Sequence, residues 1–272
     1  QIAPPTKLKN GFFSNPFTML VEMYGLPSYN GINPTAFFAL TYTLLFGLMF
    51  GDMGQGFVLL VVGLLISKLK KNPAGGIVSR VGISSMFFGF IYGSVFGFED
   101  VLDPVYKVLG FGGKPLEVFK QTNFILLGAV ALGAVLITIS IVLNIILGFK
   151  QKNFEKAIFG CNGLVGLTFY LSVVIGAALQ LLEGIKVFTP LYVIFLVVIP
   201  LLLMFFRTPL SNYVKYKKTH ADDEESEGIG SFIAENFFEL FEFMLSYVTN
   251  TMSFLRVGGF ILSHAGMMLV VM

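Results

Sequence analysis

Long runs without charged side chains constrain this sequence more than any other feature. Residues 36–66 form one apolar run that is broken only around Asp52, and no charged residue lies between Lys120 and Lys150. A helix needs about 20 consecutive apolar residues to cross a bilayer. Only 12% of the residues are charged, against about 25% in soluble domains. The sequence therefore predicts an all-α polytopic membrane protein.

The run at 36–66 is too long for a single crossing of the membrane. Its centre, residues 51–56, combines three glycines with a charged and an amide side chain, which disfavours a continuous helix. We therefore expect a tight helical hairpin at this point. About seven transmembrane helices are predicted in all, the last one long, tilted and with a polar stripe, near 36–50, 54–68, 78–97, 123–148, 157–182, 187–206 and 229–272.

The basic residues indicate how these helices are oriented. We assign residues 1–34 to a cytoplasmic or interfacial segment before a transmembrane domain at 35–272. Segments on the cytoplasmic side then carry thirteen Lys and Arg residues, and those on the opposite side carry four. Such an excess of basic residues is usual for cytoplasmic loops. The same assignment makes residues 208–228 a cytoplasmic acidic loop.

Other patterns exclude several kinds of site. A net charge of +2 does not favour a nucleic-acid partner. Cys161 is the single cysteine, so an internal disulfide and a cysteine metal cluster are excluded, and we expect no cofactor and no metal site. Gly89, Gly93 and Gly97 repeat at a spacing of four, which predicts a close helix–helix contact along the third helix.

Polar side chains recur along the last predicted helix, mainly at gaps of three, four and seven residues. At 3.6 residues per turn these positions share one side of the helix, within roughly 140° of its circumference. The remaining sides are apolar. The stripe consists of Glu235, Glu239, Glu242, Ser246, Thr249, Asn250, Ser253, Arg256, Ser263 and His264.

Arg256 is the most informative residue of this stripe. A charge at the centre of a membrane helix costs about 2.5–3.5 kcal/mol on insertion scales, so the stripe is expected to face protein or a water-filled cavity. Ionisable groups inside a membrane mark ion paths by default, although a structural ion pair between Arg256 and another helix stays open. No carboxylate is evident deep in another predicted helix, apart from Asp52 and Glu183 at a helix end. The partner of Arg256 is therefore expected on a different subunit.

Two runs in this helix resemble a known family. The run Met-Ser-Phe-Leu-Arg-Val at 252–257 and the run Leu-Ser-His-Ala at 262–265 resemble the penultimate transmembrane helix of the membrane stator of rotary V-type and A-type ATPases. This stator subunit is called a in eukaryotes and I in prokaryotes. Phe254 stands where the family has a tyrosine, and Ser263 where it has an alanine.

The resemblance extends to the start of the chain. Residues 46–56 resemble the family's hairpin Phe-Gly-x-Met-x-Gly-Asp-x-Gly-x-Gly, with Gln55 where His or Tyr is usual. Residues 4–8 and 23–29 resemble the segment before the membrane domain. The family also has a large N-terminal cytoplasmic arm and an eighth transmembrane helix, and no part of this sequence matches them.

The resemblance implies roles for the matching residues. Arg256 would meet the essential carboxylate of each subunit in a proteolipid rotor ring, built from c or K subunits. Glu242, Ser246 and Asn250 match the positions of a cytoplasmic half-channel, and His264 matches a histidine on the other side of the arginine. The order of the stripe further suggests that a cation is attracted from the cytoplasm by its carboxylates and passes small polar groups before Arg256. The residues expected to serve ion translocation are Arg256, Glu242, Ser246, Asn250, Ser253, His264, Glu239 and Glu235.

The chain is thus expected to couple proton or sodium translocation to rotation, and rotation to ATP hydrolysis or synthesis. It would carry no catalytic site, because ATP reacts on soluble subunits. The missing arm would join peripheral-stalk subunits and the soluble ATPase sector, and the lipid bilayer surrounds the rest. Short loops without Asn-x-Ser/Thr sites resemble prokaryotic members, which favours a plasma membrane.

Two other functions stay open. A self-contained secondary ion transporter would be expected to have internal repeats or helices broken at matching positions in two halves. The hairpin at 51–56 is the only such break that the sequence suggests. A purely structural anchor for a stalk would not require a polar stripe that ends in an arginine.

Overall fold

The computed structural model describes residues 7–27, 31–70, 72–98, 101–108, 110, 118, 121–151, 157–158, 160–183, 188–206 and 229–271. In this part of the chain the regular structure is helical, and one isolated β-bridge joins Val95 to Phe98. The chain divides into two compact units. The first unit consists of residues 1–129 and 254–272, and the second of residues 130–253.

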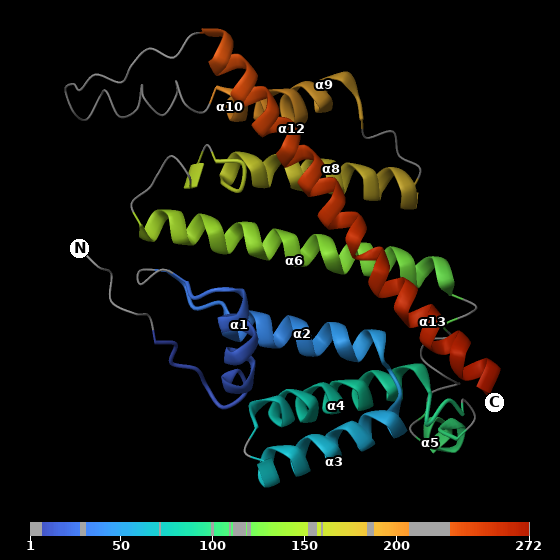
Figure 1. The fold of residues 1–272 in the computed structure, drawn as a ribbon. Helices are drawn as coiled ribbons and strands as arrows, with labels where there is room; N and C mark the ends of the chain where they lie inside the picture. The colour runs from blue at the N-terminus through green and yellow to red at the C-terminus, as the bar shows by residue number, and fades with distance from the viewer. Residues whose placement is uncertain are drawn as a thin grey trace. The chain divides into compact units, whose positions relative to one another are not determined.

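Three helices form the framework of the first unit. They are α2 (Thr35–Met49), α3 (Met53–Lys70) and α4 (Pro73–Tyr92), which lie side by side in Figure 1. The N-terminal segment contains η1 (Asn15–Phe17) and α1 (Thr18–Tyr24). It packs against α2 and α4 through the fully buried Phe17.

Glycines bring the backbones of α3 and α4 into contact. A Cβ atom at Gly82 would lie 2.6 Å from the nitrogen of Leu60, and one at Gly63 would lie 2.4 Å from the nitrogen of Ser79. No side chain fits at such distances, so the two helices reach this separation only with glycine at these positions. The contact glycines are spaced by seven residues, at 56 and 63 in α3 and at 75, 82 and 89 in α4.

This helix contact differs from the predicted one. The bounds of the predicted helix at 78–97 are wrong by five residues at each end. Asn72 caps the N-terminus of α4, and Gly93 ends the helix in the left-handed conformation, with φ at 74°. Gly93 and Gly97 therefore lie beyond the helix. Of the predicted glycine repeat, only Gly89 takes part in the α3–α4 contact.

Two further helices complete the first unit. The short α5 (Asp103–Val108) places the fully buried Tyr106 against Phe90, with ring centroids 5.4 Å apart. α13 (Leu255–Val271) packs on α2, and its Val257 and Ile261 share a core cluster with Ile125.

The second unit contains most of α6 (Thr122–Lys150), together with α8 (Leu164–Glu183), α9 (Pro190–Val193), the π-helical η2 (Ile194–Val198), α10 (Ile199–Phe205) and α12 (Ile229–Ser253). Figure 1 shows α12 running obliquely across α8 and α10. The π turn has a local cause. Pro200 has no N–H for the carbonyl of Leu196, four residues earlier, and the Ser172 hydroxyl donates to that carbonyl instead, at 2.8 Å.

A helix occurs at the place of each of the seven predicted transmembrane helices. Three helical stretches of the described chain are long and apolar enough to cross a membrane, namely Pro73–Tyr92, Thr122–Lys150 and Ile233–Val271. The other apolar helices are shorter, so the count of seven crossings stays a prediction. The last predicted helix is not continuous, because Phe254 forms a turn between α12 and α13. The predicted acidic loop at 208–228 lies outside the described residues.

Candidate functional site

Most of the predicted polar stripe lies on α12. Its members on this helix are exposed, except for the partly buried Glu239: they are Glu235, Glu242, Ser246, Thr249, Asn250 and Ser253. The Asn250 side-chain nitrogen donates a hydrogen bond of 3.1 Å to the hydroxyl of Ser246, one turn earlier. α12 therefore carries a polar side that the described helices leave largely uncovered.

A different side of α12 packs inside the second unit. Tyr247, which follows Ser246 and so lies about 100° further round the helix, is buried and donates its hydroxyl hydrogen to the carbonyl of Cys161. The hydroxyl of Thr251 lies 3.0 Å from that of Tyr170. These contacts fix the rotation of α12 about its axis and leave the stripe facing outward from the unit.

Arg256 lies in the first turn of α13, two residues after the turn at Phe254. Its side chain is exposed and forms no hydrogen bond or ion pair with any described residue. A guanidinium group keeps its charge at any working pH. Arg256 therefore presents a fixed positive charge on the first unit that is free to meet a carboxylate.

His264 lies on the packed side of α13, unlike Arg256. It is buried, and its ring centroid lies 4.6 Å from that of Phe50. Its Nε2 atom has no hydrogen-bond partner among the described residues. His264 lines a cavity of about 160 Å³ together with Tyr92 and Ser94. The single polar side that was predicted therefore does not continue from Arg256 to His264.

Asp52 is a buried carboxylate outside the predicted stripe. It lies in the turn between α2 and α3 and has no exposed surface. Its Oδ1 atom accepts hydrogen bonds from the backbone nitrogens of Gln55, at 2.8 Å, and Phe96, at 2.9 Å. Its Oδ2 atom accepts from the Gly97 nitrogen, at 2.8 Å, and the Ser94 hydroxyl, at 2.6 Å. One carboxylate thus joins the start of α3 to the turn that follows α4.

The local sequence explains why this carboxylate can be buried. Asp52 caps α3 in the way that aspartate commonly caps helix N-termini. Phe96 and Gly97 have positive φ angles of 51° and 86°, and such turns direct successive N–H groups toward an anion. Burial acts to raise the pKa of the Asp52 carboxyl, but the hydrogen bonds outweigh it, and the pKa lies below its ordinary value. An aspartate inside a glycine-rich break between apolar runs is the sequence signal for this site.

The predicted site residues are thus divided between the two units. Six of the eight residues expected to serve ion translocation lie on α12 in the second unit, whereas Arg256 and His264 belong to the first. Asp52 and its four donors form a separate cluster that the sequence analysis did not predict.

Comparison with known proteins finds similarity to one family. Residues 1–102 match the V-type ATPase 116kDa subunit family. This range contains α2, α3, α4 and the Asp52 turn, but none of the stripe. An A-type ATP synthase subunit I from Pyrococcus horikoshii is 33% identical over 193 residues, which cover 66% of this chain and 28% of that protein.

Two further relatives agree with this match. An A-type ATP synthase subunit I from Archaeoglobus fulgidus is 37% identical over 98 residues, or 35% of this chain and 14% of that protein. The human V-type proton ATPase 116 kDa subunit a 2 is 32% identical over 107 residues, or 34% of this chain and 12% of that protein. The chain spans less than a third of the length of each of these relatives. Residues 1–102 thus match the V-type ATPase 116kDa subunit family, and the chain is similar over 193 residues to a subunit I of A-type ATP synthases.

Proposed function

We propose that this chain is part of the membrane stator of a rotary ATPase and guides ions to and from a rotating ring of proteolipid subunits. Protons or sodium ions pass along the polar side of α12 and load or unload a carboxylate on the ring. Rotation then carries that carboxylate past Arg256. Ion movement is thereby coupled to rotation, and rotation to ATP hydrolysis or synthesis on soluble subunits. The chain itself has no ATP-hydrolysing role.

The exposure of the polar side of α12 is the observation that carries this proposal. Two carboxylates, Glu235 and Glu242, stand on that side with Ser246, Asn250 and Ser253. Such groups cannot face lipid without a large cost. Since a different side of α12 packs inside the unit, a second protein is expected to cover the stripe and enclose a wet path. A self-contained transporter would instead place these side chains among its own helices.

The exposed charge of Arg256 supports the same role. In a low-dielectric setting a guanidinium strongly favours a neighbouring carboxylate in its charged, ion-free form. A ring carboxylate that approaches Arg256 would therefore release its ion. A fixed cation on the path also repels protons and sodium ions, which prevents leakage without rotation.

The partners follow from this role. We infer that a ring of c or K proteolipids faces α12, and that peripheral-stalk subunits and the soluble sector join through a cytoplasmic arm, with lipid around the rest. A prokaryotic plasma membrane is the proposed location, in line with the subunit I relatives from Pyrococcus horikoshii and Archaeoglobus fulgidus.

Site-directed crosslinking tests which protein covers the stripe. Single cysteines at Ser246 and Ser253, with Cys161 replaced by alanine, should form crosslinks to a small proteolipid in membranes of the source organism. Val248 is the matched control, because its side chain is 62% exposed but lies about 200° round the helix from Ser246. Crosslinks only within this chain would favour an internal path and a transporter. Crosslinks to the proteolipid that are equally strong from Val248 would contradict the placement of the ring against the polar side of α12.

The variant Arg256→Ala tests the mechanism. It should abolish ATP-driven ion transport in vesicles that contain the assembled complex, because nothing then displaces the ion from the ring carboxylate. Met267→Ala, at an exposed position on the same helix, is the control and should transport normally. Transport that persists in an assembled Arg256→Ala complex would refute the proposed role.

A further inference from the structure

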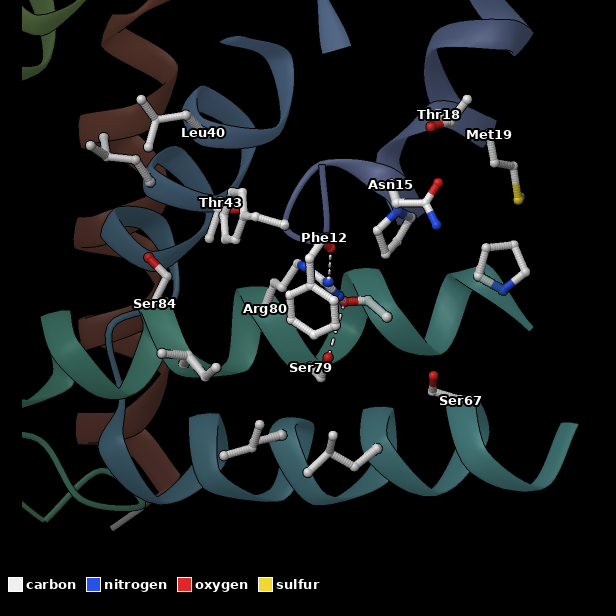
Figure 2. A pocket seen from close by; sticks show the side chains of 18 of the residues that line it. Phe12, Asn15, Thr18, Met19, Leu40, Thr43, Ser67, Ser79, Arg80 and Ser84 are labelled. Atoms are coloured by element: carbon white, nitrogen blue, oxygen red, sulfur yellow. Dashed lines mark hydrogen bonds between the residues drawn. The ribbon is translucent and has the colours of Figure 1, made fainter. Parts of the chain in front are cut away.

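A large cavity lies in the first unit, far from the stripe in sequence. It has a volume of about 1180 Å³ and is lined by the N-terminal segment, α2, α3 and α4 (Figure 2). Ligand pockets commonly measure about 300–1,000 Å³, so this cavity has room for a long chain. Its wall on the three helices is largely apolar and includes Leu40, Leu44, Leu60, Leu64, Ile83 and Phe87.

Arg80 places a positive charge in this cavity. Its two terminal nitrogens donate hydrogen bonds of 2.6 Å each to the carbonyls of Gly76 and Phe12. The rings of Phe12 and Phe13 lie 5.3 and 5.7 Å from the guanidinium carbon, and Figure 2 shows Arg80 beside Phe12 at the centre of the site. These contacts hold the guanidinium in place but do not neutralise it, because carbonyls and rings carry no net charge.

The cavity is also lined by a carboxylate that forms no ion pair with Arg80. Glu22, from α1, lines the same space but forms no ion pair with Arg80 or any other described residue. Arg80 stands about two turns inside α4, whose N-terminus the basic residues assign to the cytoplasmic side. Ser67 and Asn72 line the cavity at that end. The cavity thus has an apolar wall, and two separate charges, Arg80 and Glu22, lie at the end where lipid headgroups are expected.

We propose that this cavity binds one membrane phospholipid with an amine in its headgroup, such as phosphatidylethanolamine. The phosphate contacts the remaining N–H groups of Arg80, whose planar fork suits phosphate oxygens. The ammonium group lies toward Glu22, and an acyl chain follows the wall past Leu64 and Phe87. Basic pockets between transmembrane helices on the cytoplasmic side are suited to lipid headgroups.

Other occupants fit these features less well. A free phosphate ion would leave the apolar wall uncovered. An apolar helix of another protein would cover the wall but leave the charge of Arg80 without a counter-ion. The proposed lipid site does not depend on the rotary role of the chain.

The test uses the protein in its complex, reconstituted into phosphatidylcholine vesicles. The probe is phosphatidylethanolamine with a photoreactive group on its acyl chain, and labelled peptides are mapped by mass spectrometry. Label should appear on the segments of α2, α3 and α4 that line the cavity. Arg80→Gln should reduce this labelling about tenfold, the effect of losing one charge-assisted contact. Lys68→Gln, at an exposed position outside the cavity, is the control and should leave the labelling unchanged.

A second variant separates binding from folding. Leu64→Trp fills the wall but keeps the contacts of Arg80, and it should also reduce the labelling in a complex that assembles normally. Excess unlabelled phosphatidylethanolamine should compete with the probe, and inorganic phosphate should not. Unlabelled phosphatidylglycerol should compete more weakly than unlabelled phosphatidylethanolamine. In Glu22→Gln the two lipids should compete equally. Labelling that is unchanged in both Arg80→Gln and Leu64→Trp, or is displaced by inorganic phosphate, would overturn the proposal. So would a crosslink from a photoreactive residue at position 64 to another protein.

Discussion

Replacing Asp52 by asparagine tests whether one carboxylate joins α3 to the turn that follows α4. The substitution keeps the size and shape of the side chain but removes its charge and turns one oxygen into a donor. Both carboxylate oxygens accept two hydrogen bonds in the structure, so no orientation of the new amide satisfies all four donors.

The cost follows from these four contacts. If the amide nitrogen takes the place of Oδ2, the Ser94 hydroxyl can turn to accept, but the N–H of Gly97 loses its acceptor. If it takes the place of Oδ1, the N–H groups of Gln55 and Phe96 both lose theirs. Hydrogen bonds to a charged group contribute about 1.5–3 kcal/mol each. The loss of one of these hydrogen bonds and the weakening of the others should lower the free energy of local opening by about 3 kcal/mol. The opening equilibrium constant should then rise about 100-fold.

Hydrogen–deuterium exchange of the purified complex measures this opening directly. In Asp52→Asn, the amides of Phe96 and Gly97 should exchange about 100-fold faster than in the unmodified protein. Asp103→Asn is the control, because Asp103 lies six residues after Gly97 and takes no part in the hydrogen bonds of the Asp52 cluster. Unchanged exchange at Phe96 and Gly97 would show that the turn is held by other contacts and that the reasoning is wrong.

Two further substitutions probe how the helices pack. Gly82→Ala should lower the melting temperature of the detergent-solubilised protein, since its Cβ would lie 2.6 Å from a backbone nitrogen and overpacking costs about 1–3 kcal/mol; Gly266→Ala, with nothing within 4 Å, should not lower it. Ser172→Ala should also destabilise the protein, by about 1–3 kcal/mol, because it removes the hydroxyl that donates to the carbonyl of Leu196. That loss should shrink when Pro200→Ala restores an N–H for the same carbonyl, and equal losses in the two backgrounds would contradict this account of the π turn.

The apolar runs predicted where helices occur, but not where each one ends. The predicted third helix was placed by its hydrophobic stretch, whereas α4 is bounded by Asn72 and Gly93, whose capping signals were present in the sequence. The glycine contact was sought at a spacing of four and lies at a spacing of seven. A spacing of seven also keeps residues on one side of a helix, so the sequence contains this pattern as well.

Contacts between distant segments could not be predicted in this way. Helical periodicity shows which residues share a side, as it did for Ser246 and Asn250, but not what that side faces. The turn at Phe254 also separates Arg256 and His264 from the part of the stripe on α12, and nothing in the local pattern marks it. Three of the four donors to Asp52 lie 42 to 45 residues further along the chain, beyond the reach of any local rule.

The Asp52 cluster has a consequence for the order in which the protein is synthesised and inserted. α3 and α4 are joined by only two residues and touch through their backbones, so their pairing needs little chain and can occur early. The donors at 94–97 leave the ribosome only after α4 is complete. Until then Asp52 lacks most of its partners, and a bare carboxylate is costly in lipid. We therefore expect the α2–α3 turn to stay at an aqueous boundary until the whole of α4 and the donors at 94–97 have been synthesised.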